Sequence, residues 1–231
     1  MIFTDRSEAG RKLAARLRKY ANREDVMVLG IPRGGVPVAF EVAASLGVPL
    51  DVFVLRKLGV PEHEELAFGA IASGGVRILD TDIVQGLELS DLDIDLVTAA
   101  ERKELERRER AYRSGRPPIN VRGLTVIVVD DGIATGSSML AAITALRELK
   151  PARIVIAVPV APPTTCNRLR REVAELVCVE EPEGFYGVGQ FYRDFSQVSD
   201  EAVNELLDRA SRRFRAQKHQ DAEPTPTGTI H

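Results

Sequence analysis

Two adjacent carboxylates, Asp130 and Asp131, open a short loop that is rich in glycine and hydroxyl residues. Such a loop can turn its backbone N–H groups toward an anion, and a helix that begins behind it adds partial positive charge. The hydroxyls of Thr135, Ser137 and Ser138 can donate to the same anion. The loop therefore suits a phosphate, while the two carboxylates can accept hydrogen bonds from hydroxyls of the attached group. Phosphate and vicinal diol together describe a phosphorylated ribose.

The elements on either side of this loop predict how it is positioned. Val126–Val129 is a continuous β-branched run, which is typical of a strand buried on both faces of a parallel sheet. Met139–Leu149 consists of good helix formers. A helix capped by one aspartate is a simpler interpretation, but capping needs neither a second acid nor three hydroxyls. The residues expected around the phosphate are Gly132, Ile133, Ala134, Thr135, Gly136 and Ser137.

A second unit of strand, glycine turn and helix lies earlier in the chain. Val26–Ile31 is predicted to be a core strand, and a helix is predicted from about Val36 to Leu46. Between them stands Pro32-Arg33-Gly34-Gly35, where paired glycines let the backbone approach an anion and the arginine fork suits phosphate oxygens. Taken alone, the turn fits a solvated arginine equally well.

Two cations end the next predicted strand. Leu50–Leu55 is followed by Arg56 and Lys57, which places both at the carboxyl end of a parallel strand, where ligands bind in open α/β sheets. A solvated basic pair is the alternative interpretation of these two residues.

The run Val-Ile-Val-Val-Asp-Asp-Gly-Ile-Ala-Thr-Gly-Ser-Ser resembles the phosphoribosyl-pyrophosphate (PRPP) signature of the type I phosphoribosyltransferases. The resemblance covers about Val26 to Val179. Ile-Pro-Arg-Gly-Gly, Leu-Arg-Lys-Leu-Gly and the late aromatic segment are similar to a bacterial group of this family with no assigned acceptor. The resemblance implies transfer of the 5-phosphoribosyl group of PRPP to a planar nitrogenous acceptor, with release of pyrophosphate and Mg²⁺ as cofactor.

The resemblance also implies roles for individual residues. Asp130 and Asp131 would hold the ribose hydroxyls, the loop after them would hold the 5′-phosphate, and Arg56 and Lys57 would neutralise the leaving pyrophosphate. These four side chains are the candidate catalytic residues, and no residue is a convincing general base.

The glycine turn after the first strand resembles the pyrophosphate-binding loop of the family, with Arg33, Gly34 and Gly35 as its binding residues. A non-proline cis peptide is often associated with that loop, and Arg33–Gly34 is the bond at which glycine would ease it. The segment Leu58–Leu66 resembles a mobile loop that closes over the reaction and excludes water.

Four aromatic residues fall within the segment Glu181–Tyr192, among three glycines. They could stack on a planar acceptor or close the hydrophobic core. The family places an acceptor-binding hood near this segment, and Phe185 and Tyr186 are the candidate hood residues.

The order of elements predicts an α/β fold, an open parallel sheet with helices on both faces. We expect one domain over residues 1–215, with a mixed-charge helical arm at about 80–116 and a hood at about 180–195. The arm could be a subdomain or a dimer contact, so a homodimer is left open. Residues 216–231 are polar and are expected to form a disordered tail.

Composition restricts the class of protein. The chain has 231 residues, 44% of them hydrophobic and 28% charged, and a net charge of −3, which gives no electrostatic reason to expect a nucleic-acid partner. No apolar stretch is long enough to span a bilayer, and no signal peptide is recognisable, so the cytoplasm is the expected location. Cys166 and Cys178 do not have a metal-ligand spacing, and no protein metal site is predicted.

The same phosphate-binding and ribose-binding residues would also suit two other functions. A PRPP-binding regulator would need a nucleic-acid surface, yet neither a helix-turn-helix nor a basic stripe is visible. A hydrolase or phosphatase acting on a phosphoribosyl compound is the other alternative. The expected partners are therefore PRPP and a small planar acceptor.

Overall fold

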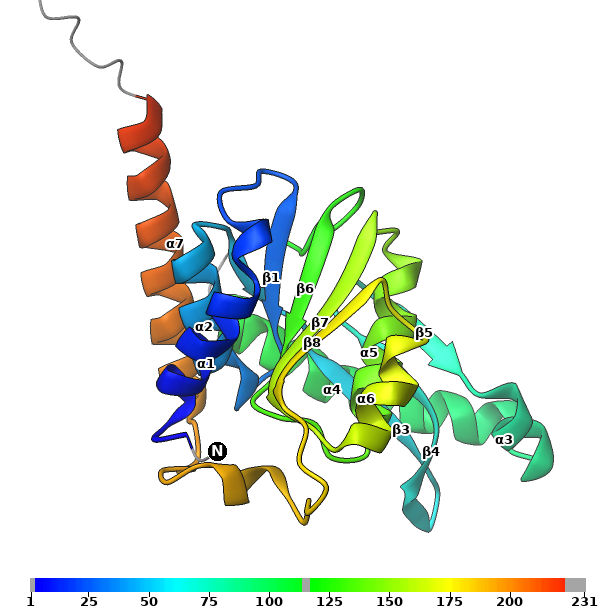
Figure 1. Cartoon of the computed structure of the whole chain (residues 1–231). Helices are drawn as coiled ribbons and strands as arrows, with labels where there is room; N and C mark the ends of the chain where they lie inside the picture. The colour runs from blue at the N-terminus through cyan, green and yellow to red at the C-terminus, as the bar shows by residue number, and fades with distance from the viewer. Residues whose placement is uncertain (1–2, 114–116, 223–231) are drawn as a thin grey trace, which may run out of the picture.

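The computed structural model describes residues 3–113 and 117–222 (Figure 1). Its centre is a five-stranded, wholly parallel sheet in the order β2-β1-β6-β7-β8. The strands are β1 (Val26–Gly30), β2 (Leu50–Val52), β6 (Thr125–Val129), β7 (Arg153–Val160) and β8 (Glu175–Glu180). The predicted α/β fold with a parallel sheet is confirmed.

Helices cover both faces of this sheet because alternate residues of its central strands point to opposite sides. Val28, Ile127 and Val155 pack on one face against α1 (Arg6–Arg16) and α2 (Gly35–Leu46). On the other face, a second cluster joins Val126 and Val128 to α5 (Ser137–Glu148) and α6 (Pro163–Arg170). The carboxyl ends of the strands are left to the connecting loops.

The predicted strand Leu50–Leu55 is wrong in its extent. The chain leaves the parallel sheet after Val52, where Phe53 N still donates to Gly30 O at 3.1 Å, and enters a separate antiparallel sheet, β3-β4-β5. That sheet contains β3 (Leu55–Val60), β4 (His63–Ala72) and β5 (Val76–Leu79). Arg56 and Lys57 therefore lie at the start of an antiparallel strand rather than at the end of a parallel one.

The predicted mobile loop Leu58–Leu66 belongs to the same sheet. It contains the end of β3 and the start of β4, joined by a tight turn in which Glu62 has a φ of 67°. Leu58 and Val60 are buried, so this part of the segment contributes core residues. The segment is a β-hairpin, and its closure over a ligand stays a prediction.

The helical arm is partly a core element. Its longer helix, α4 (Asp91–Arg113), buries Ile94, Leu105 and Tyr112 in a cluster that also contains Leu58 and Phe68 of the small sheet. The same cluster includes Val203 and Leu207 of α7 (Asp200–Ala222). α4 thus packs between the small sheet and α7, while the short α3 (Thr81–Gly86) projects at one side (Figure 1).

Several element ends differ from prediction. The sequence predicts that the final helix ends at Arg215, but α7 continues to Ala222, so the first part of the predicted tail is helical; 223–231 lie outside the described residues. The sequence also predicts a helix over Thr164–Ala174, but α6 ends earlier, at Arg170. Two short 3₁₀ turns, Arg18–Tyr20 and Val188–Phe191, complete the order.

The first helix begins at a side-chain cap. Asp5 is the N-cap of α1, and its carboxylate accepts the Glu8 N–H at 2.7 Å. None of the described helices combines the length and apolar character needed to cross a bilayer.

Candidate active site

Two glycine-bearing loops meet at the carboxyl edge of the parallel sheet because β1 and β6 are neighbours. Ile31 N, just after β1, donates to Val129 O at the end of β6 over 2.9 Å. A Cβ placed on Gly35 would lie 2.7 Å from Val129 O and 2.8 Å from Asp130 Cα. Only glycine allows the two backbones to come this close.

Gly34 makes a still closer approach to the acidic pair. A Cβ on this residue would lie 2.1 Å from Asp131 Oδ2, although its φ of −60° is open to any residue. Glycine is required here by contact with the carboxylate rather than by backbone conformation. The cis peptide lies one bond earlier than predicted, between Pro32 and Arg33.

An arginine from the first helix joins the acidic pair. Arg6 Nε lies 2.8 Å from Asp131 Oδ2, with the two side chains 12% and 13% exposed. Arg6 also donates from Nη1 to Ser196 O at 2.8 Å, and its guanidinium lies 4.0 Å from the centre of the Phe195 ring. Sequence reasoning did not find Arg6, because nothing local connects the start of the chain to Asp131.

The segment after β8 is fixed to the same motif. Tyr192 donates its hydroxyl to Asp131 O at 2.5 Å, and burial raises the pKa of Tyr192, so the phenol keeps the proton that it donates. A Cβ on Gly132 would lie 2.5 Å from Val188 Cγ1, so this glycine makes room for the hood segment. Hood, first helix and acidic pair form one packed unit.

The two carboxyl groups differ in their electrostatic environment. Burial raises the pKa of Asp130 well above its ordinary value, and the neighbouring Asp131 charge raises it further. Burial also raises the pKa of Asp131, but the ion pair with Arg6 opposes that shift. Asp131 is therefore the better anchored charge, and Asp130 is the group that more readily carries a proton.

The predicted phosphate loop is held from outside by α6. Thr165 Oγ1 donates to Ala134 O at 2.7 Å, and Arg168 donates to Thr135 O. Gly136 has a φ of 78°, in the left-handed region, and caps the N-terminus of α5. These contacts fix the turn that leads into the helix.

The members of the loop are not equally available to an anion. Ile133 is buried and its N–H already donates to Val160 O at 3.0 Å. Ala134 and Thr135 are exposed, and the Thr135 and Ser137 hydroxyl oxygens lie 3.3 Å apart. An anion can therefore reach the exposed end of the loop, beside the first turn of α5.

A cavity of ≈ 570 Å³ opens beside the acidic pair, between the two loops, the small sheet and α4. Asp130, Ser138, Arg56 and Lys57 all line it. Glu101 of α4 also lines it and accepts from Arg56 Nε at 2.6 Å, so the Arg56 charge is already paired. Lys57 is exposed and also lines a second hollow of ≈ 490 Å³ between the small sheet and α5.

Of the predicted site residues, Asp130, Arg56 and Lys57 line this cavity, whereas Asp131 and the predicted phosphate loop do not. Arg33 is exposed and does not line it, although the preceding Pro32 does. Phe185 packs against Phe191, with ring centres 5.4 Å apart, and Tyr186 is 97% exposed.

Two further aromatics of the hood belong to the core. Phe191 and Tyr192 are 8% and 6% exposed and pack with Phe3 and Val160. They cannot offer a free ring to an acceptor in this arrangement, so only Phe185 and Tyr186 remain as stacking candidates.

Comparison with known proteins shows the family of the chain. The sequence profile of the phosphoribosyl transferase domain matches residues 4–196, which include the acidic pair, both loops and the hood. The chain belongs to the phosphoribosyl transferase domain family.

Relatives of this phosphoribosyl transferase domain occur in Mycobacterium tuberculosis and Chloroflexus aurantiacus. A protein of Mycobacterium tuberculosis (strain H37Rv) named as a phosphoribosyl transferase is 47% identical over 225 residues, which is 97% of this chain and 51% of that protein. The chain thus spans about half the length of the curated relatives that it matches first. The bifunctional protein PyrR of Chloroflexus aurantiacus is 35% identical over 133 residues, covering 55% of this chain and 66% of PyrR.

A solved structure shares the whole architecture. A crystal structure of a Thermus thermophilus protein superposes with a TM-score of 0.79 at 41% identity, covering 90% of this chain and 98% of that one. The fold of the phosphoribosyl transferase domain described above is therefore found in a relative of similar length.

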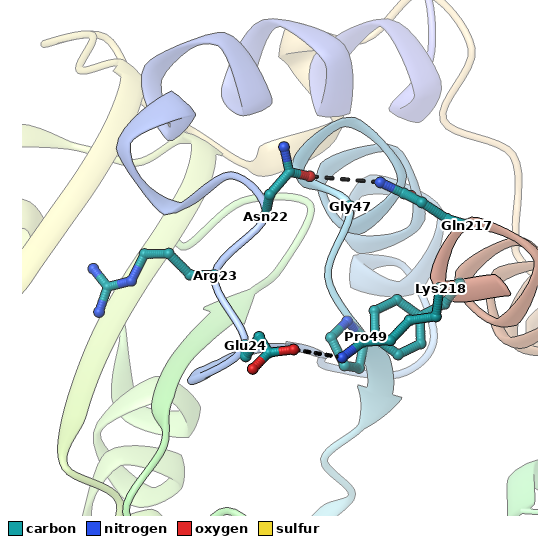
Figure 2. Close-up of a pocket in the computed structure, with 8 residues that line it drawn as sticks. Asn22, Arg23, Glu24, Gly47, Pro49, Gln217 and Lys218 are labelled. Atoms are coloured by element: carbon teal, nitrogen blue, oxygen red, sulfur yellow. Dashed lines mark hydrogen bonds and ion pairs between the residues drawn. The ribbon is translucent and has the colours of Figure 1, made fainter. Parts of the chain in front are cut away.

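A further hollow of the domain lies at the opposite, amino edge of the sheet. It measures ≈ 350 Å³ and is lined partly by Asn22, Glu24, Gln217 and Lys218 (Figure 2). Lys218 Nζ lies 2.8 Å from Glu24 Oε1, which ties the end of α7 to the segment before β1. Because ligands of open α/β sheets bind at the carboxyl edge, the ≈ 570 Å³ cavity is the candidate active site.

Proposed function

We propose that this domain transfers the 5-phosphoribosyl group of PRPP to a planar nitrogenous acceptor and releases pyrophosphate. The observation that carries the proposal is the cavity that joins Asp130, Ser138 and the Arg56–Lys57 pair at the carboxyl edge of the sheet. A hydroxyl-bearing helix start, one buried carboxylate and two cations then surround one space, as a molecule with a phosphate at each end of a ribose requires.

The 5′-phosphate would be held at the exposed end of the phosphate loop. Thr135 and Ser137 offer hydroxyls there, and the N-terminus of the twelve-residue helix α5 adds partial positive charge. Thr165 and Arg168 hold the loop from behind, so little ordering is left to the ligand.

In the reaction the bond from C1 to the pyrophosphate oxygen breaks, and a nitrogen of the acceptor forms a new bond to C1. Positive charge develops on the ribose ring as this bond breaks, as in glycoside hydrolysis. Asp131, held as an anion by Arg6, would stabilise that charge and accept from a ribose hydroxyl. Asp130, which lines the cavity, would accept from the second hydroxyl.

The leaving pyrophosphate would be neutralised by Lys57 and Arg56. Lys57 is the freer of the two, because Glu101 pairs with Arg56 at 2.6 Å. Pyrophosphate would have to displace Glu101 from Arg56. Arg56 would therefore neutralise the product only while the product is bound. We also propose that the loop after β1 binds the pyrophosphate, through Arg33, Gly34 and Gly35.

Mg²⁺ fits the donors present. Magnesium is usually bound through one or two carboxylates and the substrate phosphates, with water completing the shell. Asp130 lines the cavity and provides such a carboxylate. When bound, Mg²⁺ would supply charge neutralisation at the phosphate oxygens.

The acceptor would enter from the hood side. The exposed Tyr186 ring and the edge of Phe185 are the proposed stacking surfaces for a flat acceptor. Gln190 holds this turn in shape, because its amide donates to Gly184 O at 2.7 Å and accepts from Tyr186 N at 3.2 Å.

The proposal is tested by measuring PRPP binding and pyrophosphate release in parallel. Calorimetry with PRPP and Mg²⁺ gives the affinity, and a pyrophosphate assay with a panel of purines and pyrimidines gives turnover. The variant Asp130→Asn with Asp131→Asn serves as control; each lost charge-assisted hydrogen bond is worth roughly 1.5–3 kcal/mol. We expect PRPP affinity to fall at least tenfold in the double variant while the fold is kept.

The two measurements separate the alternatives. Binding of PRPP without pyrophosphate release for any acceptor would identify a sensor rather than a transferase. Unchanged PRPP affinity in the double variant would remove the ribose-binding assignment.

A further inference from the structure

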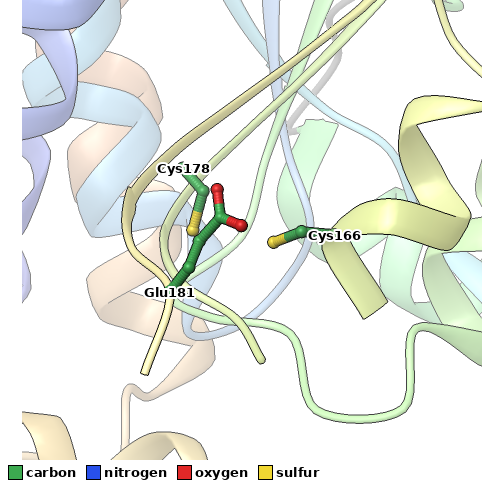
Figure 3. A group of neighbouring side chains, drawn as sticks. All are labelled: Cys166, Cys178 and Glu181. Carbon is green, nitrogen blue, oxygen red and sulfur yellow. The ribbon is translucent and has the colours of Figure 1, made fainter. Parts of the chain in front are cut away.

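A cluster of three metal-ligating side chains lies outside the candidate active site. Cys166 is on α6, Cys178 is on β8, and Glu181 follows the end of that strand. Their sulfur and carboxylate atoms all lie within 4.8 Å of one another. Figure 3 shows the Cys166 sulfur pointing toward the Glu181 carboxylate, with Cys178 close to the same carboxylate.

The donor set suits a thiophilic divalent cation. Thiolate sulfur and carboxylate oxygen are both zinc ligands, and a site with three protein ligands leaves a fourth position for water. Tetrahedral zinc would bring these donors to about 3.7 Å from one another, so closure of about 1 Å is enough. Glu181 is 28% exposed, which leaves an entry path, whereas Cys166 is fully buried.

The charges around the cluster also balance for a divalent ion. Two thiolates and the Glu181 carboxylate carry three negative charges, and Arg170 forms an ion pair with Glu181. A divalent cation together with Arg170 brings the sum to zero. A disulfide between the two cysteines would use neither Glu181 nor Arg170.

Each thiol donates to a backbone carbonyl in the structure. Cys166 Sγ donates to Ala161 O at 3.9 Å, and Cys178 Sγ donates to Glu180 O at 3.0 Å.

We propose that Cys166, Cys178 and Glu181 form a binding site for one thiophilic divalent cation such as Zn²⁺. Binding displaces the thiol protons to solvent and leaves both sulfurs as ligands. The sequence does not indicate this site, because the two cysteines belong to different elements and meet only when α6 packs beside β8.

The position of the site gives the ion a structural consequence. Cys166 stands directly after Thr165 and two residues before Arg168, the side chains that hold Ala134 and Thr135. A cation shared by α6 and β8 would fasten α6 to the edge strand and so steady the support of the phosphate loop.

The experiment titrates the reduced, chelator-treated full chain with Co²⁺ in the absence of PRPP. We expect a thiolate-to-cobalt charge-transfer band that saturates at one ion per chain and disappears when Zn²⁺ is added. The chain has only two cysteines, so this band can arise from no other side chains. The readout does not depend on transferase activity, so its failure is distinct from failure of the proposed function.

Variants test the ligands one at a time. Cys166→Ser and Cys178→Ser should each lower cobalt affinity by about 100-fold or more and weaken the band, whereas Glu181→Gln should keep the band and lower affinity about tenfold. Glu183→Gln, an exposed acid of the same segment, is the matched control and should bind as the wild type does. Far-ultraviolet circular dichroism of each metal-free variant confirms that it is folded.

Three results would overturn the proposal. These are absence of the charge-transfer band at micromolar protein with excess Co²⁺, a band that survives unchanged in either serine variant, and a Cys166–Cys178 disulfide as the stable state of the protein purified without reductant.

Discussion

Arg6 and Asp131 form a nearly buried ion pair, with Nε and Oδ2 2.8 Å apart, between the first helix and the acidic motif. The same guanidinium lies over Phe195 and donates to Ser196 O. Arg6 thus contacts the motif and the segment after the hood at once, and it keeps Asp131 charged in a setting where burial alone would favour protonation.

Replacement of Arg6 by glutamine should destabilise the protein and weaken PRPP binding. Removal of one partner leaves a buried charge without its counter-ion, which costs about 3 kcal/mol. Urea unfolding measures this change. Arg11→Gln is the control, because Arg11 is 58% exposed and lies 3.7 Å from Glu41, so its loss should cost less than about 0.5 kcal/mol. Equal losses in the two variants would show that the Arg6 pair has no special weight.

Asp130→Asn should make the free protein more stable at neutral pH. The folded-state pKa of Asp130 is raised above its ordinary value of 3.8, so its contribution to stability is fully present below that value and is lost as pH rises through the folded pKa. The amide does not ionise and escapes this loss, while its oxygen can still accept the Asp131 N–H.

The stability gain of Asp130→Asn over the wild type should therefore be small near pH 4 and grow toward pH 7, as measured by urea unfolding at both values. PRPP affinity should fall in the same variant. A gain that is independent of pH would contradict the assignment of the shift to ionisation of this carboxyl.

Gly34→Ala should disturb the acidic pair without straining the backbone. The added methyl would lie 2.1 Å from Asp131 Oδ2, so the carboxylate or the loop has to move. We expect PRPP affinity to fall at least tenfold, measured by calorimetry. Gly184→Ala, which meets nothing within 4 Å, is the control and should bind PRPP normally. Normal binding by Gly34→Ala would show that the loop yields at little cost.

Thr165→Val should loosen the phosphate loop from behind. The variant loses the hydrogen bond to Ala134 O, worth about 1 kcal/mol, and keeps the shape of the side chain. We expect several-fold weaker binding of PRPP or inorganic phosphate. Thr164→Val, at the neighbouring exposed position, provides the comparison. Identical affinities in the two variants would mean that α6 does not support the loop.

Tyr186→Ala separates an acceptor contact from a core contact. The ring is 97% exposed, so its loss should leave the melting temperature unchanged, but it should raise the acceptor KM about tenfold if the ring stacks on the acceptor. Phe191→Ala removes a buried ring and should instead cost about 3–5 kcal/mol of stability. An unchanged acceptor KM in Tyr186→Ala would remove the stacking proposal for this ring.

Local sequence patterns were sufficient for the units in which neighbouring residues decide the structure. Val126–Val129 and the helix formers after the glycine loop indicate a buried strand, a turn and a helix, and β6 and α5 lie there. The capping pair Asp5 and Glu8 likewise indicates the start of α1. These features depend on hydrogen bonds and burial periods within a few residues, so the order of amino acids determines them.

The boundary between the two sheets was not predictable in this way. Phe53 and Val54 continue the apolar run of β2 into β3 without a glycine or proline, and both are buried. The change of sheet depends on which strands lie alongside, and that is a property of the packed chain. The sequence predicts Arg56 and Lys57 near the site, at the end of a parallel strand. They do line the cavity, but from the start of an antiparallel strand.

Contacts between residues far apart in the chain are determined only by the tertiary structure. Arg6 meets Asp131, Glu101 meets Arg56, and Cys166 meets Cys178 because α1, α4 and α6 pack where the sheets and the other helices leave room. Each contact joins two elements, and the local sequence pattern of one element does not predict where the other will pack. The free energy that brings these elements together comes from burying several apolar faces at once. This total cannot be read from any single stretch of the sequence.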